Sequence, residues 1–317
     1  MIGLLSRFGK ERLGDYPTPL RYIRLDNKRG FWIKDEGRAH RSYGGNKVRK
    51  LEYLFGSARR SHRRRLVVWG DAGSHTVEAV SILGRESGFD VTAVTYSGTN
   101  LAAEGHQRPS RVERHAVVHQ TRNILSAFVL ARLKGMGPGR VYVPLGATTA
   151  YSTLGHLSAA CEFVEQWQSI RSAWPKSIYV AMGSGGTVSG LATGFALLGI
   201  PIKINAVQTV NSSITNPLTL RKQVSAVLKL LELDAGLAKS ILSDFVLIDR
   251  RYLGQGYGDV TPSSMNAIEK ARNFGLELEP VHTGKVMAAV INSLITEETS
   301  EIIYWHTHSR TSPDLEC

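Results

Sequence analysis

The chain is poor in cysteine: Cys161 and Cys317 are the only two in 317 residues. Two cysteines cannot build the disulfide framework of a small secreted domain, so a reducing, cytoplasmic setting is expected. Long apolar runs are also missing, and none approaches the ~18 residues that a membrane-spanning helix needs. Only a very short apolar patch precedes Arg7 and Lys10, which makes the start a poor secretory signal. These absences leave a globular, non-membrane protein as the expectation.

Acidic residues are fewer than basic ones, 27 against 39, which gives a formal net charge of +12 and a pI near 9.8. A basic excess can serve nucleic-acid binding. The densest cluster, RRSHRRR at residues 59–65, precedes an apolar run, where a helix should end, and cations suit a helix C-terminus. It contains no aromatic residue that could stack on bases. We therefore expect a solvated helix end and small anionic ligands, with no nucleic-acid partner.

Strand-like and helix-like segments alternate along the chain, which predicts a mostly parallel sheet with helices on both faces. The strand-like segments are 66–69, 91–96, 141–143, 178–182, 202–207, 246–248 and 302–305. The helix-like segments are 48–61, 76–86, 125–133, 151–168 and 188–198, whereas residues 97–114 are polar and turn-rich. There is no internal repeat and no obvious linker, so composition alone sets no domain boundary.

Residues 44–54 read GGNKVRKLEYL. Gly44 and Gly45 can take backbone angles that are closed to other residues and can let a planar ligand approach. Asn46 can donate to a ring oxygen of that ligand or cap a helix start. Lys47 opens an amphipathic segment, and its neutral amine could form an imine. On its own, this pattern also fits a glycine turn that caps a basic surface helix.

Residues 183–187 read GSGGT, between a strand-like SIYVAM and a helix-like segment. Backbone amides of such a loop at a helix N-terminus form an anion site, which suits a phosphate. The loop lacks the lysine of a Walker motif, and Val188 occupies the last glycine position of a GxGxxG dinucleotide motif. Taken alone, a plain strand–helix turn explains it equally well.

Further segments carry polar residues at positions where strands or loops end. They are GDAGSHT at 70–76, GQGYG at 254–258, GLELEPVHTGK at 275–285 and IIYWHT at 302–307. Ser74 can act as an N-cap for the helix that follows it, and a loop at a helix N-terminus is a suitable carboxylate site.

Together with YPTPL at 16–20, these segments resemble the aminocyclopropane-carboxylate deaminase and D-cysteine desulfhydrase family. Its members are pyridoxal phosphate (PLP) enzymes with the α/β fold of tryptophan synthase β, called fold type II. The resemblance implies two open α/β domains with the cofactor in the cleft. By the same resemblance, a small domain at 52–157 would be inserted between the two parts of a large PLP-binding domain, 1–51 and 158–317. The family also implies a homodimer.

The resemblance assigns expected roles to named residues. It makes Lys47 the Schiff-base lysine, Ser74 a neighbour of the substrate carboxylate, and Tyr257 the active-site tyrosine. The phosphate cup would consist of Gly183, Ser184, Gly185, Gly186 and Thr187. Lys50 would reach the same phosphate, unless it is a surface lysine. Thr283 would face the pyridine nitrogen, and a neutral hydroxyl there favours the desulfhydrase or dehydratase side over deaminases that use glutamate.

The chain departs from the family pattern at expected active-site positions. His75 stands where asparagine is expected, and could donate to the PLP phenolate oxygen. His282 stands at an expected tyrosine, and we expect it to take a catalytic role in proton transfer or in binding the substrate carboxylate, the alternative being that both histidines are packing substitutions. His308 and Ser309 replace a glycine pair and should crowd the site. His115 and His119 have the spacing of a metal pair, but no carboxylate motif accompanies them, so no metal is expected.

The function implied by the resemblance is that of a PLP-dependent lyase or deaminase acting on a small amino acid. The reaction would be β-elimination to pyruvate and ammonia, as in D-cysteine desulfhydrase, or ring opening of aminocyclopropane carboxylate. β-Replacement by a second nucleophile is the alternative on the same fold. A PLP-binding protein without the family activity and a basic nucleic-acid binder with a degenerate enzyme fold are alternatives of other classes.

Overall fold

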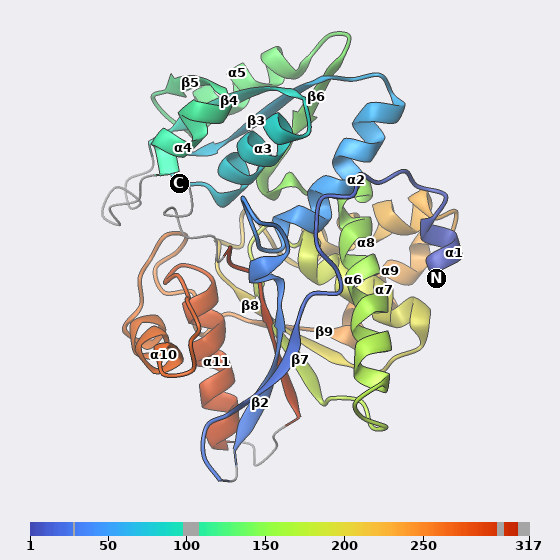
Figure 1. The fold of residues 1–317 in the computed structure, drawn as a ribbon, viewed down its shortest axis with the longest axis vertical. Coiled ribbons are helices and arrows are strands. Elements are labelled where there is room, and N and C mark those ends of the chain that lie inside the picture. The colour runs from blue at the N-terminus through green and yellow to red at the C-terminus, as the bar shows by residue number, and fades with distance from the viewer. Residues whose placement is uncertain (28, 98–107, 297–300, 310–317) are drawn as a thin grey trace.

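The computed structural model describes residues 1–27, 29–97, 108–296 and 301–309, and its strands form two sheets (Figure 1). The larger sheet has the order β1-β2-β10-β7-β8-β9, and the smaller one has the order β5-β4-β3-β6. The strands of the larger sheet are β1 (Leu20–Arg24), β2 (Gly30–Asp35), β7 (Ser177–Met182), β8 (Lys203–Gln208), β9 (Val246–Asp249) and β10 (Ile302–His306). Those of the smaller sheet are β3 (Arg65–Asp71), β4 (Asp90–Tyr96), β5 (Val117–Thr121) and β6 (Arg140–Val143).

All pairings are parallel except the β1–β2 hairpin at one edge of the larger sheet. β7 reads SIYVAM and is buried almost throughout, as a central strand covered on both faces should be. The expected α/β fold with parallel sheets is therefore confirmed. The β1–β2 hairpin was not predicted.

Helices cover both faces of the larger sheet (Figure 1). On one side lie α10 (Pro262–Arg272) and α11 (Thr283–Thr296), packed around Tyr179 and Tyr304. On the other side lie α6 (Ala150–Gln168), α7 (Gly186–Leu198), α8 (Pro217–Leu230) and α9 (Ala238–Phe245). Trp32 and Trp305 enter this second core, because neighbouring residues of a strand point to opposite faces.

The smaller sheet is covered in the same way. One face packs against α2 (Lys47–Arg60), α3 (His75–Glu86) and α4 (Arg108–His115), and the other packs against α5 (Ile124–Gly135). The remaining elements among the described residues are α1 (Ile2–Leu5) and the short 3-10 turns η1 (Glu36–Arg38), η3 (Leu145–Ala147) and η4 (Ala235–Leu237). α4, which the sequence did not predict, begins within the polar stretch at 97–114 and ends one residue after it. Residues 98–107 of that stretch lie outside the described residues.

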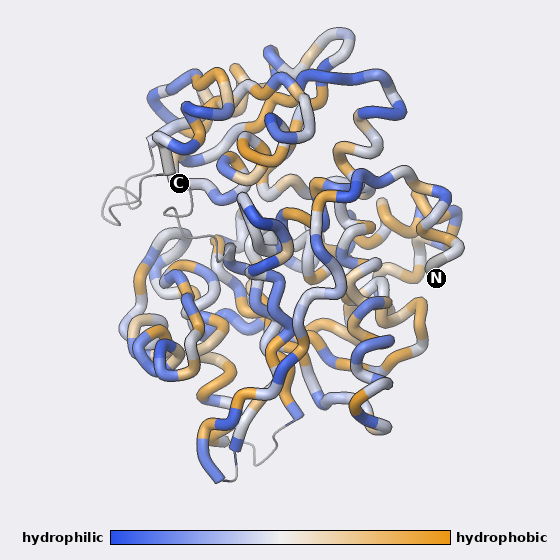
Figure 2. Tube along the Cα trace, viewed as in Figure 1, coloured by the Kyte–Doolittle hydropathy of each residue, from blue (hydrophilic) through white to orange (hydrophobic). Residues whose placement is uncertain are grey.

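α2 ends at Arg60, so the basic cluster at 59–65 begins at a helix end, as predicted. All of its residues are exposed, and the path from α2 to β3 is hydrophilic (Figure 2). Cys161 is buried with a free thiol, and Cys317 lies outside the described residues. Among the described helices, none is both long and apolar enough to cross a membrane.

The strands of the smaller sheet fall at residues 65–143, within the range predicted for the small domain. Both predicted boundaries lie inside helices, at 51/52 in α2 and at 157/158 in α6, and these two helices pack on each other. The division into domains stays a prediction. α2 begins with Lys47, the predicted Schiff-base lysine, and places it where the two sheets meet.

Candidate active site

Lys47 is the first residue of α2, directly after a glycine turn. Gly45 has φ +85°, which favours glycine, and a side chain on Gly44 would meet Gly37 O at 1.8 Å. The turn is held on both sides, because Gly45 N donates to Glu36 O at 2.7 Å and Asn46 N donates to Thr307 O at 3.2 Å. The base of the Lys47 side chain is therefore fixed.

The environment of Lys47 favours its neutral amine. Burial lowers the pKa of Lys47 to about 8, and Glu279 acts in the opposite direction by raising it. The Lys47 Nζ donates to Asn46 Oδ1 at 3.1 Å. A lysine with this pKa is partly neutral near physiological pH, which imine formation requires.

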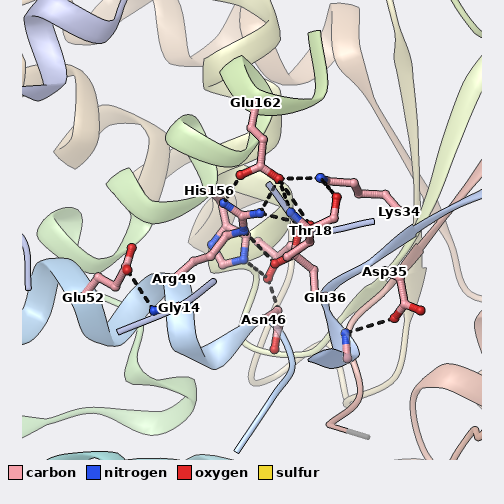
Figure 3. Close-up of polar contacts among 12 residues, drawn as sticks. Gly14, Thr18, Lys34, Asp35, Glu36, Asn46, Arg49, Glu52, His156 and Glu162 are labelled. Atoms are coloured by element: carbon pink, nitrogen blue, oxygen red, sulfur yellow. Dashed lines mark hydrogen bonds and ion pairs between the residues drawn. The ribbon is translucent and has the colours of Figure 1, made fainter. Parts of the chain in front are cut away.

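A buried charge network anchors α2 behind this turn (Figure 3). Arg49 Nε donates to Glu36 Oε2 at 2.6 Å, and the Arg49 guanidinium forms a two-pronged contact with Glu162 of α6 at 2.8 and 3.0 Å. Glu162 also pairs with the buried Lys34 of β2, whose Nζ donates to Thr18 O at 2.8 Å. Burial lowers the pKa of Arg49, but Glu36 and Glu162 raise it by more, so the guanidinium stays charged.

Lys50 lies one turn after Lys47 and faces the start of α7. It is buried, and its Nζ donates to Gly146 O and to Thr148 Oγ1, each at 3.0 Å. A side-chain carbon on Gly186 would lie 2.8 Å from Lys50 Nζ, so only glycine leaves this space open. Burial and the nearby Lys47 hold the pKa of Lys50 well below its ordinary value. The alternative of a surface lysine is therefore wrong, and an anion bound here would let Lys50 keep its proton.

The GSGGT loop connects β7 to α7 as expected, and Gly185 is the N-cap residue with φ +86°. Thr148 ties the loop to the η3 turn, because its Oγ1 lies 2.8 Å from Ser184 Oγ. Gln223 of α8 holds the loop from the other side, with Nε2 donating to Ser184 O at 2.7 Å. The backbone amides at the α7 start and Lys50 together form an anion site.

Asn46 joins the lysine turn to the α7 start. Its Nδ2 donates to Thr187 Oγ1 at 2.9 Å, and Thr187 Oγ1 also lies 3.2 Å from His156 Nε2 of α6. Asn46 is the N-cap residue of α2 by position, but its side chain makes no capping hydrogen bond. Of the two roles expected for Asn46, side-chain capping is therefore wrong.

Ser74 and His75 lie at the N-terminus of α3. Ser74 is the N-cap, and its Oγ accepts from Thr76 N at 3.3 Å. The Tyr43 hydroxyl lies 3.2 Å from His75 Nδ1, and the rings of His75 and His308 meet edge to face with centroids 5.1 Å apart. The capping role predicted for Ser74 is present, and Ser74 also lines the same pocket as Lys47.

Glu279 holds the start of α11. Its carboxylate accepts from the backbone amides of Val281, His282 and Thr283 at 2.9, 2.8 and 2.6 Å. Burial raises the pKa of Glu279, but His282, His308 and the backbone amides of Thr283 and His282 lower it by more, so Glu279 is ionised. Thr283 Oγ1 lies 3.2 Å from Glu279 Oε1.

The His282 ring is fixed by a contact of 2.7 Å between its Nδ1 and Thr209 Oγ1, at the end of β8. Tyr257 lies opposite, with its ring centroid 6.0 Å from that of His282. The Tyr257 backbone amide donates to Asn211 Oδ1 at 3.0 Å, which holds the GQGYG loop in place.

All sequence-predicted site residues line one pocket between the two sheets. They are Asn46, Lys47, Lys50, Ser74, His75, Gly183, Ser184, Gly185, Gly186, Thr187, Tyr257, His282 and Thr283. His308 and Ser309 line it too, as expected from their place after β10. Within the part of the chain that the structure describes, no three metal-ligating side chains come together.

Sequence reasoning missed several residues that support the site. Glu279 was quoted within a motif without a role, and Tyr43, Thr148, His156 and Thr209 were not singled out. Glu279 could have been recognised as an acidic residue just before a helix start. The others contact the site only through the folded arrangement and carry no local signal.

These residues fit PLP. The pocket offers a lysine whose pKa favours imine formation and an anion site at the α7 start. Lys47 and Lys50 lie close together in this pocket, and burial disfavours the charged form of each. The negative charge of a bound phosphate would stabilise the charged lysine. Lys47 would hold the cofactor aldehyde, while Lys50 and the loop at 183–187 would hold its phosphate.

Comparisons with known proteins give the family and the fold. A family model described as "Pyridoxal-phosphate dependent enzyme" matches residues 11–307. A D-cysteine desulfhydrase from Salmonella typhi is 28% identical over 320 residues, covering 96% of this chain and 94% of that protein. The crystal structure of an ACC deaminase homologue matches with a TM-score of 0.82 at 23% identity, covering 98% of this chain and 94% of that one. An L-serine ammonia-lyase from the fungus Rhizomucor miehei matches with a TM-score of 0.67 at 17% identity, covering 93% and 94%.

The matches to these two solved structures show the fold, and the predicted fold type II is confirmed. The predicted cofactor, PLP, and the predicted class, a PLP-dependent lyase or deaminase, are confirmed as well. The family model spans nearly the whole chain, including each of the motifs that line the pocket. This chain therefore belongs to the pyridoxal-phosphate dependent enzyme family.

Proposed function

We propose that this protein eliminates the β-substituent of a small amino acid and that D-cysteine is its substrate. D-Cysteine and water would give pyruvate, ammonia and hydrogen sulfide. The support is the similarity to D-cysteine desulfhydrase along almost the full length of both chains. Thr283 at the start of α11 adds to it, because a neutral hydroxyl rather than a glutamate stands at the position implied to face the cofactor nitrogen.

The observation that carries the proposal is the joint placement of Lys47, with its pKa lowered to about 8, and the α7 anion site in one pocket. PLP, when bound, supplies a sink for the electron pair that remains when a proton leaves the substrate Cα. The Lys47 amine takes that proton, since a base with a pKa near the working pH is most effective. Tyr257 is the second candidate for this proton transfer.

The substrate carboxylate binds at the N-terminus of α3, where Ser74 and the first-turn amides offer donors. His282, held by Thr209, faces the leaving group or the carboxylate from the opposite wall. His75 and His308 border the pocket and set which substrate groups fit. The lysine turn thus provides the base, and the α3 start binds the substrate carboxylate. The α11 start places His282 at the leaving group or the carboxylate.

We also propose a homodimer in the cytoplasm. The family resemblance supports the dimer, and the free, buried Cys161 suits a reducing compartment. Sedimentation of the purified protein checks the assembly: a monomer at every concentration would contradict it.

Turnover with a panel of amino acids tests the function. The panel contains D- and L-cysteine, D- and L-serine and aminocyclopropane carboxylate, and the products measured are keto acid, ammonia and sulfide. We expect sulfide and pyruvate in equal amounts from D-cysteine, and loss of both in Lys47→Ala. Turnover of aminocyclopropane carboxylate alone would replace the proposal with ring opening.

The same panel, repeated with an added thiol or amine, separates elimination from β-replacement. Replacement would divert product from pyruvate to a new amino acid. Binding of panel members that changes the cofactor absorbance without product would identify a binding protein instead. Both outcomes would contradict the proposed elimination.

A further inference from the structure

His156 is a fully buried histidine that the proposed chemistry does not use. It lies on α6, behind the first turn of α7, and its Nε2 is 3.2 Å from Thr187 Oγ1. Its Nδ1 is buried with no hydrogen-bond partner among the described residues. A side-chain carbon on Gly190 would lie 2.5 Å from the His156 Cβ, so the two helices are in close contact there and hold the imidazole in place.

The charge state of His156 is fixed by its surroundings. Burial, followed by the nearby cations Lys50, Arg49 and Lys47, holds the pKa of His156 well below its ordinary value. The ring is therefore neutral, with one N–H and one bare nitrogen. Which nitrogen carries the proton decides what the Thr187 hydroxyl can do.

Thr187 Oγ1 already accepts a hydrogen bond from Asn46 Nδ2, whose amide orientation is set because Asn46 Oδ1 accepts from Lys47 Nζ. If His156 carries its proton on Nδ1, that N–H is buried without an acceptor. Nε2 is then the bare nitrogen, and the Thr187 hydroxyl donates its hydrogen bond to it. In either form Nδ1 is buried without a partner and costs about 1–3 kcal/mol, so the two forms differ in what the Thr187 hydroxyl can do. If the proton is on Nε2, Thr187 Oγ1 accepts twice and its own proton is free to be donated.

The free proton would be used within the anion site. Thr187 lines the pocket in the first turn of α7, beside Lys50 and the loop amides. A hydroxyl that donates to a phosphate oxygen forms a charge-assisted hydrogen bond, which is stronger than one to a neutral nitrogen. Anion binding and the Nε2–H form of His156 therefore stabilise each other.

We propose that His156 is a positioning residue of the phosphate site: its Nε2–H donates to Thr187 Oγ1 and directs the Thr187 hydroxyl proton to the phosphate of PLP. The inference rests on PLP as the cofactor and does not depend on which amino acid is turned over. A failed substrate panel would therefore leave it standing, and its own failure would leave the proposed elimination standing.

NMR of the imidazole nitrogens of His156 in the unmodified holoenzyme tests the proton assignment directly. We expect a neutral ring protonated on Nε2 near pH 7. A ring protonated on Nδ1 would overturn the proposal, and this measurement needs no variant to fold.

Two variants test the link to the phosphate. His156→Gln places an amide donor where Nε2 lies, whereas His156→Asn cannot reach Thr187 with its shorter side chain. We expect His156→Asn to weaken PLP binding, and inorganic phosphate binding to the cofactor-free protein, about tenfold or more, the size of one hydrogen bond to a charged group. His156→Gln should retain most of both affinities.

Pyridoxal, which lacks the phosphate, is the ligand control, and its affinity should be the same in both variants. Leu157→Ala is the matched variant, because Leu157 is equally buried on α6 and packs in an apolar cluster with Leu154 and Val227. If His156→Asn lowers pyridoxal and PLP affinity alike, or if Leu157→Ala reproduces its effect, His156 is only a packing residue. When Thr187→Val is already present, adding His156→Asn should lower phosphate affinity no further. If His156→Asn weakens phosphate binding as much in the Thr187→Val protein as in the parent, the proposal is also overturned.

Discussion

Arg49 Nε donates to Glu36 Oε2 at 2.6 Å, directly beneath the turn that presents Lys47. The same Glu36 accepts the Gly45 amide through its backbone carbonyl at 2.7 Å. One residue thus holds the turn and the first helical turn of α2 together. Because the contact is buried, its loss has a large expected cost.

We expect Arg49→Met to lower the free energy of unfolding by about 3–5 kcal/mol, because it removes the guanidinium from the buried Glu36 and leaves Glu162 with Lys34 as its cation. Urea denaturation of the cofactor-free protein measures this. Arg60→Met is the matched control on the exposed end of the same helix, and it should change stability by less than about 0.5 kcal/mol. Equal effects of the two substitutions would contradict a structural role for the network.

The rate at which cofactor-free protein takes up PLP should rise with pH and level off above about pH 8. The reactive form is the neutral Lys47 amine, and burial lowers the pKa of Lys47 to about 8 from its ordinary 10.5. Glu279→Gln removes the charge that raises this pKa, so the midpoint should move to lower pH. Glu277→Gln, an exposed neighbour, should leave it in place. A midpoint near the ordinary lysine value, or no shift in Glu279→Gln, would contradict this assignment.

Lys50→Gln should weaken PLP binding by about tenfold or more, because it removes a cation from the phosphate site. Pyridoxal affinity should change little, and Lys222→Gln on the exposed side of α8 should change neither. Equilibrium dialysis with both ligands measures this. Gly185 is a poor position for the same test, since it has φ +86° and a side chain there would meet Leu220 at 2.7 Å. Unchanged PLP affinity in Lys50→Gln would remove Lys50 from the phosphate site.

Two substitutions restore the family residues at the altered positions, His282→Tyr and His75→Asn. An unperturbed imidazole titrates at about 6.5 and a phenol at about 10, so histidine can exchange protons near neutral pH where tyrosine rarely does. We expect at least one variant, more strongly His282→Tyr, to change the pH profile and the substrate ranking. If both keep the parent rate, pH profile and ranking, the histidines are packing substitutions.

The sequence predicted the parallel strands and the helices α2, α3, α5, α6 and α7 because those segments have clear periodicity, whereas the helices from α8 to α11 were not predicted. β7 is a continuous apolar run before a glycine loop, and α2 begins at the lysine of its motif. The β1–β2 hairpin was missed because Gly30–Asp35 contains Lys34 and Asp35, which look exposed but are buried: Lys34 pairs with Glu162, and Asp35 accepts from Gly37 N at 3.1 Å. α4 was missed because its sequence, RPSRVERH, is almost wholly polar.

The sequence predicted those residues of the site that lie within short local motifs. Lys47 and the loop at 183–187 stand out because their chemistry is concentrated in a few neighbouring residues. Thr148 and His156 were missed because their partners Lys50 and Thr187 are distant in sequence, by 98 and 31 positions. The burial of Lys50 likewise depends on how α2 meets η3, which no local pattern reveals.

The central claim is that Lys47 carries the cofactor. The direct measurement is borohydride reduction of the PLP-saturated protein, followed by proteolysis and mass spectrometry of the lysine peptides. We predict a pyridoxyl group on Lys47, and its absence from that site in Lys47→Ala. A pyridoxyl group on Lys50, or on no lysine of the saturated protein, would contradict the claim.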